Sequence, residues 1–535
     1  MKKHIIVCDH IHEEGLKLLN TQDDITMENL AYLPKDELLQ HLHKADVLIT
    51  RSSTAINEKL LELAFKDSKK LKAIVRAGVG VDNVDIDACS YRGVVVMNVP
   101  TANTIAAVEL TMTHLLSAIR RLPSANSQLK NERKWRREDW YGIELKDKKL
   151  GIIGFGNIGS RVGIRAKAFD MQVIAYDPYI NPNKALDLGI DYTTNFDDIL
   201  SCDIITIHTP KNKQTTNIIT SKEIAKMKDG VILINCARGG LYNENDLYEG
   251  LKSNKIAWAG LDVFDCEPAT NNKLLDLDNV YVTPHIGANT LESQEKIATE
   301  AATAAISAAR GSAFPNALNL PTKTQDMPDF IVAYLELTQK LAYFAAQAIH
   351  GAISSINIYI NGQELEKYQD AFLTFCLVGA LKPSLDDKIN YVNAPFVAKE
   401  RDVQGSVEIK HNAGPYKNLI KIILNTAQES MDVSGTIYDG HIVRFNNING
   451  FGMDLEPSGN MILVRNADVP GVIGSIGHTI AKHKVNIADF RLGRKSELHE
   501  KGALALILVD SAVSTQLLDD LRAIPECISV RNVLM

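Results

Sequence analysis

The sequence predicts a multidomain α/β protein that ends in a smaller α+β unit. Apolar segments of strand length alternate with helical segments over residues 1–100 and again over residues 148–285. A glycine-rich turn joins a strand to a helix early in the second series, and residues 460–535 follow the order β-α-β-β-α-β. Alternating strands and helices favour parallel sheets with helices on both faces, and the last order is that of a ferredoxin-like unit.

Composition narrows the class of protein. A chain of 535 residues suggests three or four domains, and 45% hydrophobic with 23% charged residues is ordinary for a globular protein. A net charge of −7 argues against non-specific nucleic-acid binding. Seven cysteines without a C-x-x-C pair or zinc-ligand spacing indicate free thiols and no metal. Apolar runs are too short for a signal sequence or a membrane span, so we expect a cytoplasmic protein.

The first series predicts a small doubly wound unit. Its apolar segments are expected to form buried parallel strands, with helices between them. An apolar-rich stretch over residues 106–122 then predicts a long helix. The expected strands cover residues 4–8, 45–50, 72–75 and 94–98.

The second series predicts a larger α/β unit, followed by an alanine-rich helix over residues 291–310 that returns the chain to the first unit. A linker rich in glycine, proline and asparagine follows over residues 311–321. The expected strands of the second series cover residues 150–154, 172–176, 204–208, 231–235 and 257–261.

The remaining third of the chain divides into a middle segment and a tail. The middle segment, to about residue 459, mixes helical and strand signals and contains no catalytic motif. In the tail, Pro470 is expected in the first turn of a helix over residues 470–484, and a second helix covers residues 515–523. The expected tail strands cover residues 461–465, 487–492, 504–509 and 528–534.

The glycine-rich turn has the pattern of a dinucleotide site. Gly154 permits a tight turn, Gly156 lets main-chain amides approach a pyrophosphate, and Gly159 lets the helix pack on the strand. Asp177 ends the next strand, where a carboxylate accepts hydrogen bonds from ribose hydroxyls and repels a 2′-phosphate. These features favour NAD over NADP. The alternative is that Asp177 merely starts a turn with Pro178.

Three polar side chains lie just past apolar strands of the second series, where ligands of α/β proteins collect. Arg238 could hold a carboxylate and polarise a carbonyl. His285 could move a hydroxyl proton near neutral pH, and Glu267 could fix its tautomer. Each residue alone could equally be structural, but together they predict hydride transfer to or from a small 2-hydroxy acid.

The chain resembles the D-isomer-specific 2-hydroxyacid dehydrogenase family in four motifs, at residues 154–159, 235–240, 262–268 and 284–288. The resemblance implies a Rossmann-type NAD-binding domain inserted into a flavodoxin-like substrate domain. An α+β intervening domain and a ferredoxin-like ACT domain would follow. The implied bounds are 1–98 with 286–316 for the substrate domain, 99–285 for the NAD domain, 317–458 for the intervening domain and 459–535 for the ACT domain.

The resemblance also implies binding residues. NAD would contact Val79, Gly154, Gly156, Asn157, Ile158, Gly159, Asp177, Thr209, Pro210, Cys236, Ala237, Arg238, Asp262, His285, Gly287 and Ala288. The substrate would contact Arg51, Ser52, Arg76, Gly78, Asn103 and Arg137. Arg137 would reach a neighbouring subunit's site, which implies a homo-oligomer, dimer or tetramer. The alternative for Arg51 and Arg76 is that both are ordinary surface charges.

The implied activity is NAD-dependent oxidation of D-3-phosphoglycerate, the entry step to serine. A sibling enzyme acting on another 2-hydroxy acid, such as 2-hydroxyglutarate, and a non-catalytic NAD-sensing protein are the alternatives. In the tail, Asn466, Asp468 and Asn486 match positions that contact an L-serine effector across a pair of domains. The alternative is that Asp468 caps the helix at Pro470 and Asn486 lies in a turn.

Overall fold

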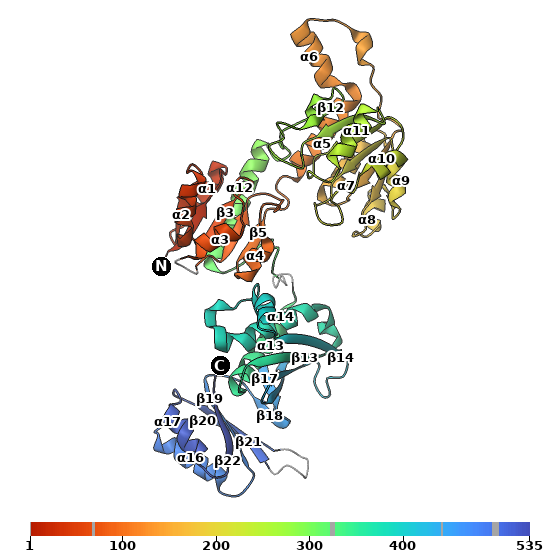
Figure 1. The fold of residues 1–535 in the computed structure, drawn as a ribbon. Helices are drawn as coiled ribbons and strands as arrows, with labels where there is room; N and C mark the ends of the chain where they lie inside the picture. Colours follow the sequence, from red (N-terminus) through yellow and green to blue (C-terminus); the bar gives the residue numbers. More distant parts are fainter. Residues whose placement is uncertain (1, 67–69, 321–326, 440–441, 495–501) are drawn as a thin grey trace. The chain divides into compact units, whose positions relative to one another are not determined.

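The computed structural model describes residues 2–66, 70–320, 327–439, 442–494 and 502–535 (Figure 1). The chain divides into two compact units by its internal contacts. The first unit comprises Met1–Ala55, Val75–Asn83 and Met97–Asn316, and the second comprises Ile56–Ile74, Val84–Val96 and Ala317–Met535. Within the described ranges, no helix is long and apolar enough to cross a membrane.

The N-terminal sheet has five strands in the order β2-β1-β3-β4-β5, which is the flavodoxin-like order. Strand β2 was missed by the sequence analysis because it is a polar edge strand of which only Ile25 is buried. Its strands are β1 Lys3–Val7, β2 Ile25–Asn29, β3 Val47–Thr50, β4 Ala73–Arg76 and β5 Val95–Asn98. The helices of this region are α1 Glu13–Asn20, α2 Lys35–His41, α3 Glu58–Phe65 and α4 Ile86–Tyr91.

The alanine-rich segment forms helix α12, Leu291–Arg310, which returns the chain to this region as predicted. It packs on α1 so closely that a Cβ on Gly15 would lie 2.7 Å from the carbonyl oxygen of Ala298. Small side chains therefore set the spacing of the two helices.

The second sheet is parallel and has seven strands in the order β12-β11-β10-β9-β6-β7-β8. The order reverses between β6 and β9, and that switch point is where dinucleotides bind in Rossmann folds. The edge strand β8 was not predicted, because its three residues are too few to show an apolar period. The other edge strand, β12, is the apolar segment that was expected before His285. The strands are β6 Lys149–Ile153, β7 Gln172–Tyr176, β8 Asp191–Thr193, β9 Ile204–Ile207, β10 Val231–Asn235, β11 Ile256–Leu261 and β12 Val280–Val282.

Apolar cores cover both faces of this sheet, and the helices that build them differ in burial. Helix α5, Thr104–Arg120, is largely buried, whereas α6, Leu122–Glu132, has no buried residue and extends away from the sheet in Figure 1. The predicted helix over residues 106–122 thus ends early, at Arg121, which has a left-handed φ of 51°. The other helices are α7 Asn157–Lys167, α8 Asn183–Leu186, α9 Phe196–Leu200, α10 Ser221–Lys226 and α11 Glu244–Lys252.

The middle segment forms a six-stranded sheet in the order β14-β13-β15-β16-β17-β18. Its buried residues share one core with the two long helices α13 and α14. The helices are α13 Asp329–Ala348, α14 Gln369–Leu385 and α15 Ala394–Glu400. The strands are β13 Ile353–Asn361, β14 Gln404–Lys410, β15 Leu419–Thr426, β16 Ser430–Tyr438, β17 Ile442–Ile448 and β18 Phe451–Leu455.

The tail has the predicted ferredoxin-like topology, an antiparallel sheet in the order β20-β21-β19-β22. Two details of the prediction are wrong. Helix α16 begins at Val472 after the N-cap Gly471, so Pro470 precedes it, and no side chain, Asp468 included, caps it. The elements are β19 Asn460–Ala467, α16 Val472–Lys482, β20 Ile487–Arg494, β21 Gly502–Val509, α17 Thr515–Arg522 and β22 Cys527–Leu534.

Candidate active site

The glycine-rich turn between β6 and α7 has the backbone that a phosphate-binding turn needs. Gly154 has a φ of 90°, where a side chain would be strained. A Cβ on Gly159 would lie 2.1 Å from the carbonyl oxygen of Gly154, so only glycine lets α7 start this close to the strand. A Cβ on Gly156 would meet nothing within 4 Å. Open space therefore borders the first amides of α7, where a phosphate can bind.

Asp177 and Thr209 flank this turn. One carboxylate oxygen of Asp177 accepts a hydrogen bond from the Phe155 amide at 2.9 Å, and the other accepts from the Tyr179 amide at 3.0 Å. Asp177 therefore does start a turn, and it also lies beside the glycines. Thr209 packs against Gly154, and its buried hydroxyl oxygen has no hydrogen-bond partner among the described residues. Such a group costs about 1–3 kcal/mol, which a bound dinucleotide could offset by hydrogen bonding.

The other residues implied for NAD lie at the same ends of the strands. Asn157 and Ile158 form the first turn of α7, and Pro210 follows β9. Cys236 and Ala237 follow β10, and Gly287 and Ala288 follow β12. The residues present therefore fit a dinucleotide across the switch point, although their individual contacts stay predictions.

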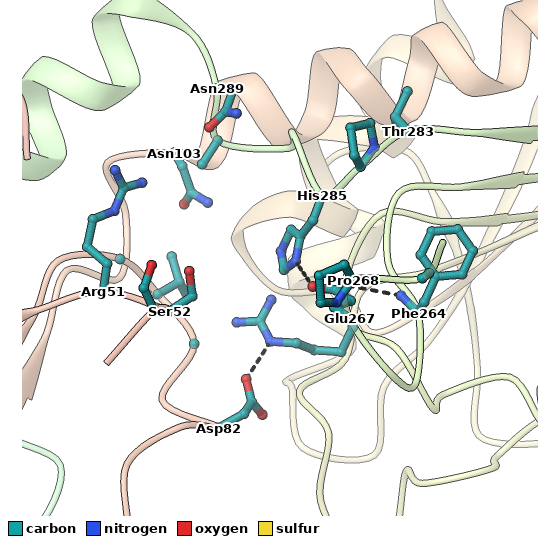
Figure 2. Close-up of a pocket in the computed structure, with 18 of the residues that line it drawn as sticks. Arg51, Ser52, Asp82, Asn103, Phe264, Glu267, Pro268, Thr283, His285 and Asn289 are labelled. Carbon is teal, nitrogen blue, oxygen red and sulfur yellow. Dashed lines mark hydrogen bonds and ion pairs between the residues drawn. The ribbon is translucent and has the colours of Figure 1, made fainter. Parts of the chain in front are cut away.

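A cleft of about 760 Å³ lies within the first unit, beside these strand ends (Figure 2). Figure 2 shows Arg51 and Asn103 on one side and Glu267 and His285 on the other. Ten predicted site residues line the cleft, namely Arg51, Ser52, Arg76, Gly78, Val79, Asn103, Arg238, Glu267, His285 and Ala288. The charged side chains of its lining are three arginines, His285, Asp82 and Glu267.

Arg51 and Arg76 are not ordinary surface charges. Burial lowers the pKa of Arg51. Burial first, and then the charges of Arg238 and Arg51, lower the pKa of Arg76 to about 10. The Nε atom of Arg76 is buried without a partner in the described part of the chain, and a Cβ on Gly78 would lie 1.7 Å from its Nη1. Asp9 and Asp82 offset these effects only in part. Cations held this closely indicate a site that can bind an anion.

Arg238 follows β10 in a turn that Asn235 holds. The Asn235 side chain, 3% exposed, donates to the Arg238 carbonyl at 2.8 Å and accepts from the Ala237 amide at 3.0 Å. The Arg238 guanidinium donates to Asp82 at 3.1 Å and to the Ala237 carbonyl at 2.7 Å, and it lies against Gly80. These bonds use two of the five N–H donors of a guanidinium, so donors remain for a carboxylate in the cleft.

His285 and Glu267 form the predicted pair, with 2.7 Å between Nδ1 of His285 and Oε2 of Glu267. Partial burial opposes ionisation of Glu267, but hydrogen bonds from His285 and from the Phe264 amide hold its pKa below the ordinary value. An ionised carboxylate only accepts, so Nδ1 carries a hydrogen and Nε2 is the atom left to exchange a proton. His285 has a left-handed φ of 53°, a strained backbone of the kind that clusters at functional sites.

Asn103 and Arg137 differ in placement. Asn103 precedes α5 and lines the cleft, and its buried side-chain oxygen has no partner among the described residues. Arg137 begins the short 3-10 helix η2, Arg137–Trp140, is exposed, and is not among the residues that line this cleft. The structure of one chain thus leaves the substrate contact of Arg137 a prediction.

Sequence reasoning missed several supporting residues. Asp82 follows β4, and nothing in the local sequence shows its ion pair with Arg238, 156 residues away. Asn235 belongs to the motif at residues 235–240, but no role for it could be predicted from the sequence. Thr283 and His114 meet at 2.9 Å although 169 residues separate them. Contacts between residues so far apart in the sequence leave no periodic pattern by which they could be predicted.

A second pocket, of about 280 Å³, lies in the tail and is lined by Asn466, Asp468 and Arg494, among others. The buried side-chain oxygen of Asn466 has no partner in the described part of the chain. Asp468 pairs with Arg494 at 3.2 Å rather than capping a helix. Asn486 is not among the residues that line this pocket, and its side-chain amide donates a hydrogen bond to Asp510 at 2.6 Å.

Two segments of the chain match known domain families. Residues 112–287 match the NAD-binding domain of D-isomer specific 2-hydroxyacid dehydrogenases. Residues 330–449 match the intervening domain of D-3-phosphoglycerate dehydrogenase.

Whole-chain relatives point the same way. The D-3-phosphoglycerate dehydrogenase of Bacillus subtilis is 36% identical, covering 99% of both chains. That of Methanocaldococcus jannaschii is 37% identical, covering 97% of this chain and 98% of the relative. The structure of an Aquifex aeolicus D-lactate dehydrogenase complexed with NAD and lactic acid is 29% identical with a TM-score of 0.51. It covers 58% of this chain and 96% of its own.

Proposed function

Because the chain belongs to the D-3-phosphoglycerate dehydrogenase family, we propose that it oxidises D-3-phosphoglycerate to 3-phosphohydroxypyruvate with NAD, the first step of phosphorylated serine biosynthesis. The observation that carries the proposal is a single cleft that holds the His285–Glu267 pair together with Arg51, Arg76 and Arg238. The pair supplies acid–base chemistry, and the arginines supply positive charge for a substrate that is anionic at both ends.

His285 acts as the base. Its Nε2 accepts the proton of the C2 hydroxyl, while ionised Glu267 stabilises the imidazolium that forms. Arg238 binds the carboxylate and aligns the carbon with the cofactor. NAD, when bound, accepts the hydride from C2. In the reverse direction His285 returns the proton to the carbonyl oxygen.

Arg51 and Arg76 bind the phosphate end of the substrate, with Ser52, Gly78 and Asn103 beside it. A phosphate carries up to two negative charges near neutral pH, and two half-buried arginines provide charge-assisted hydrogen bonds to it. Lactate and glycerate have no second anionic group for these cations, and the distal carboxylate of 2-hydroxyglutarate carries one negative charge where a phosphate carries up to two. This is why phosphoglycerate suits the cleft better than lactate or 2-hydroxyglutarate.

Initial rates of NADH formation test the proposal, with 3-phosphoglycerate, glycerate, lactate and 2-hydroxyglutarate as substrates. We expect a kcat/KM for 3-phosphoglycerate at least tenfold above the others. Preference for an unphosphorylated acid would instead establish a sibling 2-hydroxyacid dehydrogenase, and binding of NAD without turnover of any acid would indicate an NAD sensor. His285→Ala should lower kcat by about 10²–10⁴-fold, and near wild-type turnover would remove the proton relay.

We further propose four domains with the bounds given above, and a homo-oligomer. Helix α6 and the segment after it expose Leu129, Trp135 and Tyr141, which are 48%, 76% and 79% accessible. Large apolar side chains exposed on one projecting element suit a contact with a second copy, and Arg137 lies in the same segment. A monomer in sedimentation analysis would contradict this proposal. The seven cysteines, all unpaired, support a reducing, cytoplasmic location.

We also propose that the tail pocket binds L-serine as a feedback effector. Asp468 would pair with the ammonium group, and the oxygen of Asn466, which has no partner among the described residues, would accept a hydrogen bond from it. Asn486, placed elsewhere in this chain, would come from a second ACT domain. Titration of L-serine should lower the rate or shift the melting temperature, and Asp468→Ala should abolish the effect. No response in the wild-type protein would contradict effector binding.

A further inference from the structure

One buried carboxylate holds the loop that presents His285. Asp262, 1% exposed at the end of β11, accepts hydrogen bonds from the amides of Ile286 and Gly287, each at 2.8 Å. The hydroxyl of Thr283 donates to it at 2.6 Å, and the His285 amide donates to its carbonyl at 2.9 Å. These bonds surround the left-handed residue His285 on both sides, so they oppose relaxation of its strained backbone.

The network continues to a buried histidine on α5. His114 is 4% exposed, and its Nε2 lies 2.9 Å from the hydroxyl oxygen of Thr283. The single hydroxyl hydrogen of Thr283 is used toward Asp262, because an ionised carboxylate cannot donate. His114 must therefore donate through Nε2–H, which assigns its tautomer. Burial favours the neutral imidazole and lowers the pKa of His114, although the Asp262 charge opposes this.

The sheet leaves room for this imidazole. A Cβ on Gly260 in β11 would lie 2.9 Å from the Cβ of His114 and 3.1 Å from its Nδ1. A side chain at position 260 would therefore crowd the imidazole of His114. Its contact with Thr283 is built into the packing of α5 on the sheet.

We propose that His114 is a positioning residue for the proton relay: its Nε2–H fixes the Thr283 hydroxyl on Asp262, and so fixes the loop that aims His285 at the substrate. The inference rests on the proposed function, because it takes His285 as the base. His114 is not among the residues that line the cleft. Its loss should therefore slow the chemical step and leave binding of the substrate largely intact.

The test compares His114→Leu with His114→Gln. Leucine removes the donor, whereas the glutamine side-chain amide can place an N–H near the position of Nε2. We expect His114→Leu to lower kcat about tenfold, with KM for 3-phosphoglycerate changed less than twofold. His114→Gln should recover most of kcat. Wild-type kcat in His114→Leu, equal loss in both variants, or a loss confined to KM would overturn the proposal.

Three further variants keep the test informative if His114→Leu does not fold. Thr283→Val should lose kcat as His114→Leu does, and Thr283→Ser, which keeps the hydroxyl, should not. Gly260→Ala changes no polar group but displaces the ring, so it should reproduce the loss. If wild-type enzyme does not oxidise 3-phosphoglycerate, the proposed function fails and this inference fails with it. If wild type turns over and these variants match it, only the inference fails.

Discussion

Replacing Arg76 by methionine should weaken substrate binding while stabilising the free protein. Among the described residues the buried Nε of Arg76 has no hydrogen-bond partner, and burial together with Arg238 and Arg51 lowers the pKa of Arg76 to about 10. For a base this sign means that folding disfavours the charged form. The resulting destabilisation is fully present at neutral pH and is relieved only as pH rises above about 10. The lowering corresponds to about 3 kcal/mol, the upper end of the cost of an unpaired buried donor.

Methionine preserves much of the apolar stem and removes that cost. We expect Arg76→Met to raise the melting temperature of the ligand-free protein and to raise KM for 3-phosphoglycerate about ten- to a hundred-fold, the value of a charge-assisted hydrogen bond. KM for NAD should not change. Scanning calorimetry and NADH initial rates check both, with the exposed Arg161→Met as the matched control. A lower melting temperature, or an unchanged KM, would refute this account of Arg76.

Four other substitutions test the rest of the site. Glu267→Gln should lower kcat at least tenfold. Because folding lowers the pKa of Glu267, its carboxylate should stabilise the protein above the ordinary carboxyl pKa of about 4.3, and this contribution should be lost as pH falls through the folded pKa. Equal melting curves of the wild type and Glu267→Gln at pH 7 would contradict the ion pair. Asp177→Ala should narrow the preference for NAD over NADP in KM, and an unchanged ratio would exclude Asp177 as the discriminator. Gly159→Ala should lower the melting temperature, because its Cβ would lie 2.1 Å from a backbone oxygen. Gly156→Ala should leave the melting temperature unchanged but raise KM for NAD. Equal melting temperatures of the two variants would contradict the packing role of Gly159.

Much of the candidate site could be predicted from the sequence because its side chains follow apolar segments of strand length. In a parallel sheet the carboxyl ends of strands share one edge, so Arg238 after β10 and His285 after β12 are expected to lie near each other. His285 and Glu267 lie 2.7 Å apart, and Arg51 and Arg76 line the same cleft, while the roles of these residues stay predictions.

The missed elements have a common cause. Strands β2 and β8 are edge strands that are short or polar, so their sequences show no alternation of apolar and polar residues. The start of α16 was misplaced because Pro470 suits a first helical turn, whereas the chain uses Gly471, with a φ of 96°, as N-cap. The conformation of the loop before the helix therefore outweighed the preference of proline for a first helical turn.

The sequence by itself determined the order of strands and helices, the dinucleotide turn at Gly154 and the set of chemical groups available at strand ends, because these follow from local periodicity and from the steric needs of glycine. Only the tertiary structure decided how those groups are supported. The pairing of Asp82 with Arg238 and of His114 with Thr283 joins residues 156 and 169 positions apart. Their proximity is a consequence of how the elements pack, which no local pattern encodes, and that packing fixes which donors remain free for substrate.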